Sequence, residues 1–405
     1  PPPASCAAAP AAVGRVRLWV YGTHCSVVAE PISALAHLFG AEMELEVAWR
    51  GTKDYCQHHA RGWWPAPSAD EASPVSELTR DVLQKQGQYW DMIQEPRRFG
   101  RRLREALRRD AAFRAADLGL CSEPAYACWA MHEAGKPLLG YFGVHIGFML
   151  GDPEDQLAFY RAFRNRITED PRSSFAASAP YISLQVFHHT SVRLPAVRPL
   201  SLYTLPASYQ GSREEDVLVS KRNLLFWDLP SLLQSFARAN ESPLRFHDAH
   251  ELQVTGKESW QHWAEFRAGV YFPYDWLQTM TFYDWMAMAI PTLVPDSPFY
   301  AYAWGTNSQT MWPVTLEGNS SAGLHPHGYA DWVDPEGRVH WWLLTDFHAL
   351  PGILRFASVG ELFTQLGARE VLWSASRRLR QAHVTRIAEA GLFWRGAVLR
   401  ALDGR

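Results

Sequence analysis

The feature that most constrains this chain is a repeated alternation of short apolar segments with helix-like ones. Residues 16–21 are β-branched and aromatic, as in a strand, and residues 30–39 place apolar side chains at helical spacing before Gly40. A second strand-like segment follows at residues 43–49. Strand, helix and strand joined by short turns are typical of a parallel sheet covered by helices. We therefore expect an α/β fold.

The alternation occupies two long stretches, and 405 residues exceed what one ordinary core accommodates. We expect two Rossmann-like domains that face each other across a cleft. The C-terminal helix carries an apolar stripe that would let it cross back over both domains, with packing on its own domain as the alternative. The predicted parts are a low-complexity stem or linker (1–14), a first domain (15–203), a linker (204–213), a second domain (214–373) and the C-terminal helix (374–405).

The remaining elements follow from periodicity and turn residues. Strands are predicted at 117–121, 137–144, 181–186, 196–200, 216–220, 244–246, 269–273 and 292–295, and helices at 124–134, 229–239, 260–265, 281–289 and 374–402. The stretch 97–114 carries eight arginines among apolar residues. It is interpreted either as a contact for phosphate or an acidic acceptor, or as a solvated helix face.

Composition narrows the partners and the location. The net charge of −3 gives no general attraction to nucleic acid or to anionic membranes, and no apolar run of about 18 residues is present to span a bilayer. A small molecule or a neutral polymer is the expected partner. The chain begins at Pro1 without Met, so a signal or anchor removed upstream is compatible with it, and the sequons at Asn240 and Asn319 permit secretion. We favour the Golgi lumen over the cytoplasm.

Several familiar signatures are missing from the sequence. No GxGxxG follows the first strand, which disfavours a standard dinucleotide site. The five cysteines show no CxxC or Cys/His pattern, so zinc and redox motifs are not expected. No Asp-x-Asp metal signature occurs, and we expect metal-independent chemistry without a cofactor.

The most informative segment is 269–295, where a strand, a polar turn, a short helix and an Ile-Pro strand follow one another. A helix that begins near Thr281 would aim free N–H groups at a diphosphate, with Thr279 and Thr281 as hydroxyl donors. Asp284, one turn in, could accept both hydroxyls of a ribose. The alternative is a capping box in which Asp284 folds back on Thr281 as N-cap.

This segment resembles the donor-binding segment of the GT-B (Leloir) glycosyltransferase superfamily. Ala289-Ile290-Pro291 stands in place of the usual Ala-Gly-Pro ending, and Asp284 stands where the superfamily generally has glutamate. The resemblance implies that Tyr274 contacts the nucleotide-sugar donor, and that Lys221 and Arg222, after the first strand of the second domain, neutralise its pyrophosphate. A basic surface pair is the alternative for these last two residues.

The acceptor side is predicted at strand ends of the first domain. Gly22, Thr23 and His24 follow the strand 16–21, Glu123 follows the strand 117–121, and His145 follows the strand 137–144. A histidine there can act as general base on an acceptor hydroxyl, as an inverting enzyme requires. His24 is the first candidate and His145 the second, and each has a structural histidine as its alternative.

Together these features predict a hexosyl- or pentosyltransferase that moves sugar from a nucleotide sugar to a hydroxyl of a glycan, protein or small-molecule acceptor. Domain closure would exclude water and prevent hydrolysis of the donor. One alternative is a sugar-nucleotide epimerase on the same fold. Another is an inactive relative that binds carbohydrate or protein.

Overall fold

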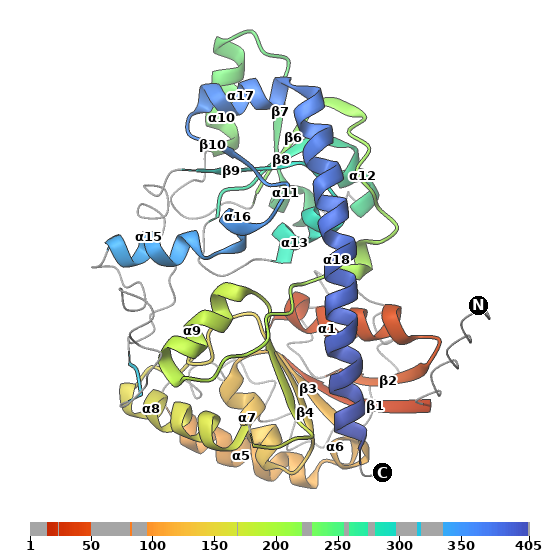
Figure 1. The fold of residues 1–405 in the computed structure, drawn as a ribbon, viewed down its shortest axis with the longest axis vertical. Coiled ribbons are helices and arrows are strands. Elements are labelled where there is room, and N and C mark those ends of the chain that lie inside the picture. The colour runs from red at the N-terminus through yellow and green to blue at the C-terminus, as the bar shows by residue number, and fades with distance from the viewer. Residues whose placement is uncertain are drawn as a thin grey trace, which may run out of the picture.

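The computed structural model describes residues 14–22, 24–49, 82, 95–167, 169–220, 229–254, 259–273, 280–296, 314–316 and 335–403. Within them the chain forms two separate five-stranded sheets, each entirely parallel, as the sequence predicted. Figure 1 shows the first sheet at one end of the molecule and the second at the other, with helices between them.

The first sheet has the order β2-β1-β3-β4-β5. The first strand in the chain, β1, lies inside the sheet. The second strand, β2, is added on one side of β1, and the later strands β3, β4 and β5 are added in turn on the other side. The point where this direction reverses lies between β1 and β3, and ligands of open α/β sheets bind outside the carboxyl ends of the strands at such a switch point. The strands are β1 (Gly14–Tyr21), β2 (Met43–Trp49), β3 (Leu118–Cys121), β4 (Leu138–Phe142) and β5 (Ser174–Ala177).

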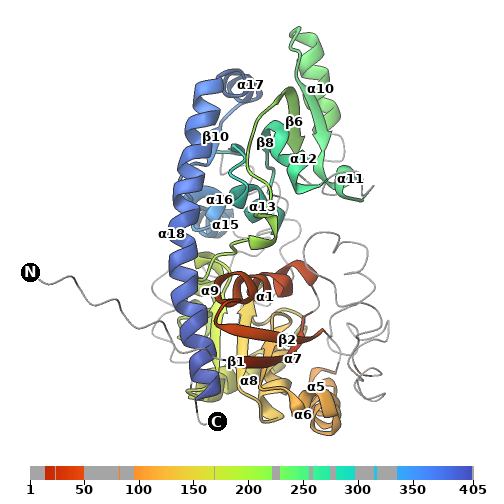
Figure 2. The ribbon, with the colours of Figure 1, turned by 90° about the vertical axis from the view of Figure 1, so that its right-hand side faces the viewer.

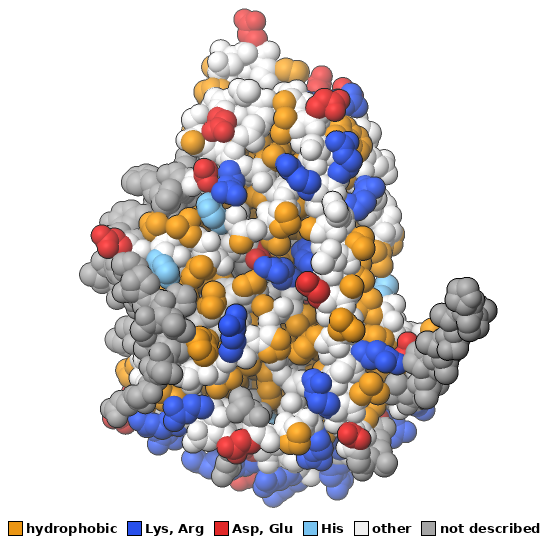
Figure 3. Space-filling view, in the orientation of Figure 1, with side chains coloured by type: hydrophobic (Ala, Val, Ile, Leu, Met, Phe, Trp, Pro, Cys, Tyr) orange, Lys and Arg blue, Asp and Glu red, His pale blue; other side chains and the backbone are white. Residues whose placement is uncertain are grey.

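The helices of the first domain cover this sheet. They are α1 (Cys25–Phe39), α5 (Pro96–Arg109), α6 (Ala111–Ala115), α7 (Ala125–Glu133), α8 (Pro153–Ala162) with the π-helical η2 (Phe163–Ile167), α9 (Pro180–Thr190) and the short 3-10 helix η3 (Leu202–Thr204). α5 buries Phe99, Leu103 and Leu107, whereas most of its arginines are exposed. In Figure 3, Lys and Arg side chains gather along the lower edge of the molecule, where α5 and α6 lie in Figure 1. The arginine stretch is therefore mainly a solvated helix face.

Two strands predicted for the first domain are wrong. Residues 181–186 belong to the helix α9, and residues 196–200 contribute only one isolated bridge, from Ala196 to Ala177. The apolar run at 181–186 fits either period, but Pro180 at the first helical turn fixes the start of a helix. The last strand is instead β5, whose Ser-Phe-Ala-Ala sequence is buried throughout and so lacks any alternation.

The second sheet has the order β10-β9-β8-β6-β7, so its switch point lies between β6 and β8. The predicted linker 204–213 precedes this sheet in the chain, except for Arg213, which is the first residue of β6. The strands are β6 (Arg213–Val219), β7 (Arg245–Asp248), β8 (Phe266–Val270), β9 (Thr292–Pro295) and β10 (Leu354–Phe356). The helices are α10 (Leu229–Ala239), α11 (Ala249–Val254), α12 (Trp260–Glu265), α13 (Met280–Ala287), α15 (Pro335–Leu343), α16 (Asp346–Ala349), α17 (Val359–Gly367) and α18 (Arg369–Leu402).

The C-terminal helix α18 crosses both domains, as predicted. Its 34 residues extend about 50 Å at 1.5 Å per residue. The first part packs with the second-domain core through Leu372 and Ala375, and the last part packs with the first-domain core through Trp394 and Val398. Figure 2 shows α18 running along most of the length of the molecule. Among the described residues, no helix combines the length and apolar character needed to cross a membrane.

One apolar cluster is continuous across the two domains. Tyr181 and His188 of α9 contact Trp341 of α15 edge-on, with ring centroids 5.9 and 5.7 Å apart. Figures 1 and 2 both place α1 and α9 on the first-domain side of the junction and α13, α15 and α16 on the other. The domains are therefore joined by packed side chains as well as by covalent connections.

Candidate functional site

The switch point of the first sheet brings together two of the predicted acceptor-side segments. β1 is followed by Gly22 and His24, and β3 is followed by Ser122 and Glu123. Since β1 and β3 are hydrogen-bonded neighbours, these residues leave the sheet side by side, and the amide of Ser122 donates to Tyr21 O. The predicted residue Thr23 lies outside the described residues.

Close approach of three strand ends is permitted by glycines. A β-carbon on Gly22 would overlap Ser122 and Val28. A β-carbon on Gly143, just after β4, would lie 2.9 Å from Val27 and 3.3 Å from Glu123 Oε2. The turns after β1, β3 and β4 are thus packed against one another, and the carboxyl group of Glu123 lies among them.

Glu123 is the most unusual group of this site. Its side chain is 4% exposed, and Oε2 accepts no hydrogen bond within the described residues. Burial raises the pKa of this carboxyl group to about 8, because a charge without a partner is costly to remove from water. At neutral pH the group is mostly protonated and can donate a hydrogen bond.

A disulfide that the sequence did not predict fixes the turn carrying Glu123. Cys121, the last residue of β3, is bonded to Cys128 of α7, with Cα atoms 5.5 Å apart. Both cysteines are fully buried, and the peptide bond between Glu123 and Pro124 is cis. A spacing of seven residues matches no motif, so only the strand-turn-helix geometry reveals this pairing.

His24 is exposed and stands immediately before α1. Its Nδ1 is 2.7 Å from the hydroxyl of Ser26, which is buried and holds the ring in place. An exposed, oriented imidazole at the switch point has the properties of a general base. The position of His24 agrees with its selection from sequence, although its catalytic role stays a prediction.

His145, the second candidate, is in a different environment. It is 1% exposed, its Nδ1 accepts the amide of Gly147 at 3.0 Å, and its ring lies edge-on to Tyr160 and His189. Burial, followed by the neighbouring histidines, lowers its pKa well below the ordinary value. These contacts are those of a structural histidine, and they disfavour the general-base role proposed from sequence.

The switch point of the second sheet is held by Ser220. Its hydroxyl accepts the amide of Phe272 at 2.8 Å, which joins the residues that follow β6 and β8. Lys221 and Arg222 come next after Ser220, and Tyr274 follows Phe272 by two residues. These three residues and Thr279 lie outside the described residues, so their donor-binding roles stay predictions.

Asp284 differs from its predicted environment. Its carboxyl group is 1% exposed, and Oδ1 accepts a 2.7 Å hydrogen bond from the hydroxyl of Tyr203, next to the predicted linker. It therefore faces protein and not an open cleft, which disagrees with a ribose contact. The capping-box alternative also fails, because α13 already begins at Met280 and Asp284 bonds to Tyr203. Thr281 lies in the first turn of α13 and is half-buried.

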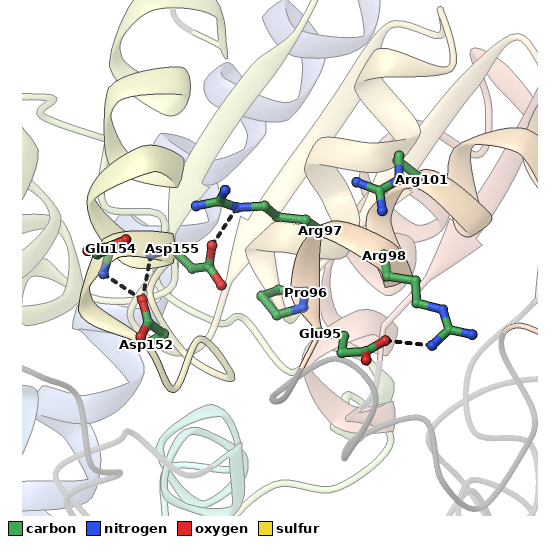
Figure 4. Close-up of a pocket in the computed structure, with 8 residues that line it drawn as sticks. All are labelled: Glu95, Pro96, Arg97, Arg98, Arg101, Asp152, Glu154 and Asp155. Carbon is green, nitrogen blue, oxygen red and sulfur yellow. Dashed lines mark hydrogen bonds and ion pairs between the residues drawn. The ribbon is translucent and has the colours of Figure 1, made fainter.

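A shallow groove of about 650 Å³ lies between the N-terminal turns of α5 and α8 (Figure 4). Its charges are largely satisfied internally: Arg97 bonds Asp155 at 2.6 Å, and Arg98 bonds Glu95 at 2.8 Å. Asp152 caps α8 by accepting the amides of Glu154 and Asp155. These contacts leave fewer charged groups of the groove available to a ligand.

The described residues include no group of three or more His, Cys, Asp or Glu side chains positioned to hold a metal ion. Two parallel α/β domains joined by a linker, with a C-terminal helix spanning both, define a two-domain protein of Rossmann-like halves. This is the GT-B architecture, the fold of a large superfamily of glycosyltransferases.

Three solved structures are similar to this chain over most of its length. UGT2 of Phytolacca americana, complexed with UDP-2fluoro-glucose and pterostilbene, is 10% identical, with a TM-score of 0.44 over 94% of this chain and 100% of that one. The glycosyltransferase SnogD of Streptomyces nogalater is 14% identical, with a TM-score of 0.41 over 93% and 97%. A UDP-glucosyltransferase of Polygonum tinctorium is 12% identical, with a TM-score of 0.40 over 94% and 99%. No protein-family model and no curated protein matches the chain.

Proposed function

We propose that the protein is a glycosyltransferase that moves a sugar from a nucleotide-sugar donor on the second domain to a hydroxyl of an acceptor on the first. The observation that carries this proposal is the pairing of two switch points. The first presents His24 and Glu123, and the second is followed in the chain by Lys221, Arg222 and Tyr274. Basic side chains at such a position suit a pyrophosphate.

His24 is assigned the role of general base. With Nδ1–H donating to Ser26 Oγ, Nε2 carries the lone pair that would accept the proton of an acceptor hydroxyl. The acceptor oxygen then forms a bond to the anomeric carbon as the bond from that carbon to the nucleoside diphosphate breaks. This direct displacement inverts the anomeric centre.

Glu123 is assigned the role of binding and orienting the acceptor. As a buried and mostly neutral acid it can donate a hydrogen bond to an oxygen of the acceptor and so orient the reacting hydroxyl. Substrate binding would also provide the partner that Oε2 lacks among the described residues.

We assign the stabilisation of negative charge on the departing diphosphate to Lys221, Arg222 and the N-terminal turn of α13 at Thr281. Cationic side chains and free amides placed where charge develops stabilise a leaving group without a metal. Metal independence is accordingly part of the proposal, as is the transfer of a hexose or pentose. Asp284 is left out of the donor contacts because it is bonded to Tyr203.

The proposal is tested by thermal shift with UDP, TDP, GDP and CMP, followed by product analysis with the matching nucleotide sugar. A nucleotide at 100 times its Kd stabilises the folded protein by about 2.7 kcal/mol, and Lys221→Ala with Arg222→Ala should abolish that shift. Arg238→Ala, on the exposed face of α10, is the matched control.

Three outcomes separate the candidate functions. A glycosylated acceptor supports the transferase. Conversion of the donor to an isomeric nucleotide sugar without an acceptor identifies an epimerase. Absence of any nucleotide-dependent stabilisation rejects both enzymes and leaves a binding protein.

A further inference from the structure

Residues 198–204, here called the strap, lead from the first domain toward the second and are fastened to both. On the first-domain side, the carboxyl group of Glu30 in α1 accepts the amides of Leu200 at 2.7 Å and of Ser201 at 2.9 Å. Glu30 is 1% exposed. One buried side chain therefore fixes two consecutive peptide groups of the strap.

The backbone of the strap is held in an uncommon conformation at this point. Ser201 has φ 47° and ψ 44°, in the left-handed region that residues other than glycine rarely occupy. Such a conformation costs of order 1 kcal/mol and persists where surrounding contacts impose it. The two hydrogen bonds to Glu30 and the hydrogen bonds from Thr204 to Ser201 O hold the backbone here.

On the second-domain side, the strap is bound by two carboxyl groups. Arg198 donates from Nε and Nη2 to Asp346 of α16 at 2.8 and 3.0 Å, and Tyr203 donates to Asp284 of α13 at 2.7 Å. Tyr283 donates to the same Asp346 at 2.8 Å. Together with the bonds to Glu30, these bonds link the two domains through the strap, so a rotation of one domain relative to the other would strain them.

α18 adds a buried cation beside the strap. Arg386 is 6% exposed, and its Nε and Nη1 have no hydrogen-bond partner within the described part of the chain. Its Nη2 lies 3.4 Å from Nδ1 of His383. Burial, before any other cause, lowers the pKa of Arg386, while Glu30 and Asp346 favour its charged form.

The groups that face the strap differ in whether they titrate near neutral pH. Burial raises the pKa of Tyr141, Tyr203 and Tyr283 well above the ordinary value, so these phenols stay neutral. Burial lowers the pKa of His383 to about 4, so it is also neutral. The remaining charged groups of the surroundings are Arg198, Asp346, Arg386 and Glu389, the last of which acts on Arg198.

Glu30 and Asp284 are the exceptions. Burial raises the pKa of each to about 7, and Asp284 is raised further by the nearby charge of Glu30. Exposure to water would return each carboxyl group to its ordinary, much lower pKa. When the two carboxyl groups are buried, they bind protons near neutral pH. When they are exposed, they release these protons.

We propose that the strap is the hinge of the two-domain molecule, and that Glu30 and Asp284 bind protons in the domain arrangement seen here and release them when the domains rotate apart. Rising pH then favours the open arrangement. This inference concerns the protein without substrate and does not depend on the proposed transferase activity.

The test is small-angle X-ray scattering of the full chain from pH 5.5 to 8.5, with hydrogen exchange of a peptide that covers residues 198–204. The ratio of open to closed molecules should rise by up to tenfold per pH unit for each proton released. The strap amides of Leu200 and Ser201 should lose protection over the same range. Glu30→Gln with Asp284→Asn should remove the pH response, whereas Glu133→Gln, a carboxyl group of α7 distant from the strap, should keep it.

Tyr203→Phe provides a second variant that conserves the ring. It removes the hydroxyl that donates to Asp284 and interacts with Ser201, and it should raise the open fraction at every pH while the dependence on pH remains. A radius of gyration and a strap protection that do not change with pH in the wild type would overturn the proposal. So would an unchanged pH response in the double variant.

Discussion

Arg198 and Asp346 are 148 positions apart in the chain and form a two-pronged ion pair between the strap and α16. Asp346 is completely buried, whereas Arg198 keeps about a quarter of its side chain in solvent. The carboxylate therefore depends on this guanidinium for compensation of its charge, since its other side-chain donor within the described residues is the neutral phenol of Tyr283. The pair joins the two domains at a point that lies within neither sheet.

Arg198→Ala should destabilise the protein by about 3 kcal/mol, because it leaves Asp346 charged and buried without its cation. Urea denaturation measures the loss. Arg98→Ala removes an exposed pair with Glu95 and should change the stability by less than about 1 kcal/mol. Equal losses of stability in the two variants would show that the interdomain ion pair contributes no more than an exposed one.

Glu123 should make stability depend on pH in a defined direction. Because its folded-state pKa of about 8 exceeds the ordinary 4.5, the folded protein retains a proton that the unfolded chain has lost. Stability should fall as pH rises from about 4.5 to 8 and then change no further. Thermal unfolding of Glu123→Gln between pH 5 and 9 should lack this part of the decline, and an identical pH profile in variant and wild type would contradict the assignment.

The sequence predicted the architecture well where local signals were complete. The predicted bounds of β2, β9, α10 and α12 coincide with the structure, since each is an apolar run or a helical pattern bordered by turn residues. β5 was missed because a short, fully buried strand has no alternation to recognise. α9 was misread because an apolar run of six residues fits both periods.

From the sequence, only the site residues that directly follow predicted strands could be found. His24 and Glu123 follow from the rule that ligands meet the carboxyl ends of parallel strands. The environment of Asp284 could not be foreseen, because its partner Tyr203 lies 81 residues earlier. Glu30, Arg198 and Asp346 carry no local signal at all, since contacts between distant segments decide their roles.

His24→Ala should lower the rate of sugar transfer by 10²- to 10⁴-fold, the usual contribution of a general base. The stabilisation by nucleotide should be unchanged, because His24 lies on the first domain. Ser26→Ala should have a smaller effect, since it removes only the partner of Nδ1. Initial rates with a saturating donor provide the measurement, and a full rate in His24→Ala would exclude this residue as the base.

Loss of the Cys121–Cys128 disulfide should cost about 2 kcal/mol, because the closed loop is short and restricts the unfolded chain only modestly. Cys121→Ala with Cys128→Ala can be compared with wild type by urea denaturation, with and without reductant. Reductant should affect wild type alone. Equal sensitivity of the double variant to reductant would mean that another pair of cysteines is responsible.

Trp394 anchors the C-terminal helix to the first domain. It is 1% exposed, and its ring centroid lies 5.6 Å from that of Tyr141 in β4. Trp394→Ala should destabilise the protein by about 3–5 kcal/mol through the cavity it leaves. Leu392→Ala, two residues away and 79% exposed, should cost less than about 0.5 kcal/mol. Because Trp394 packs on Tyr141 of β4 and α18 also contacts α1, hydrogen exchange should accelerate first in β4 and α1 and not in the second sheet. Acceleration spread evenly over both sheets would contradict a local anchoring role for Trp394.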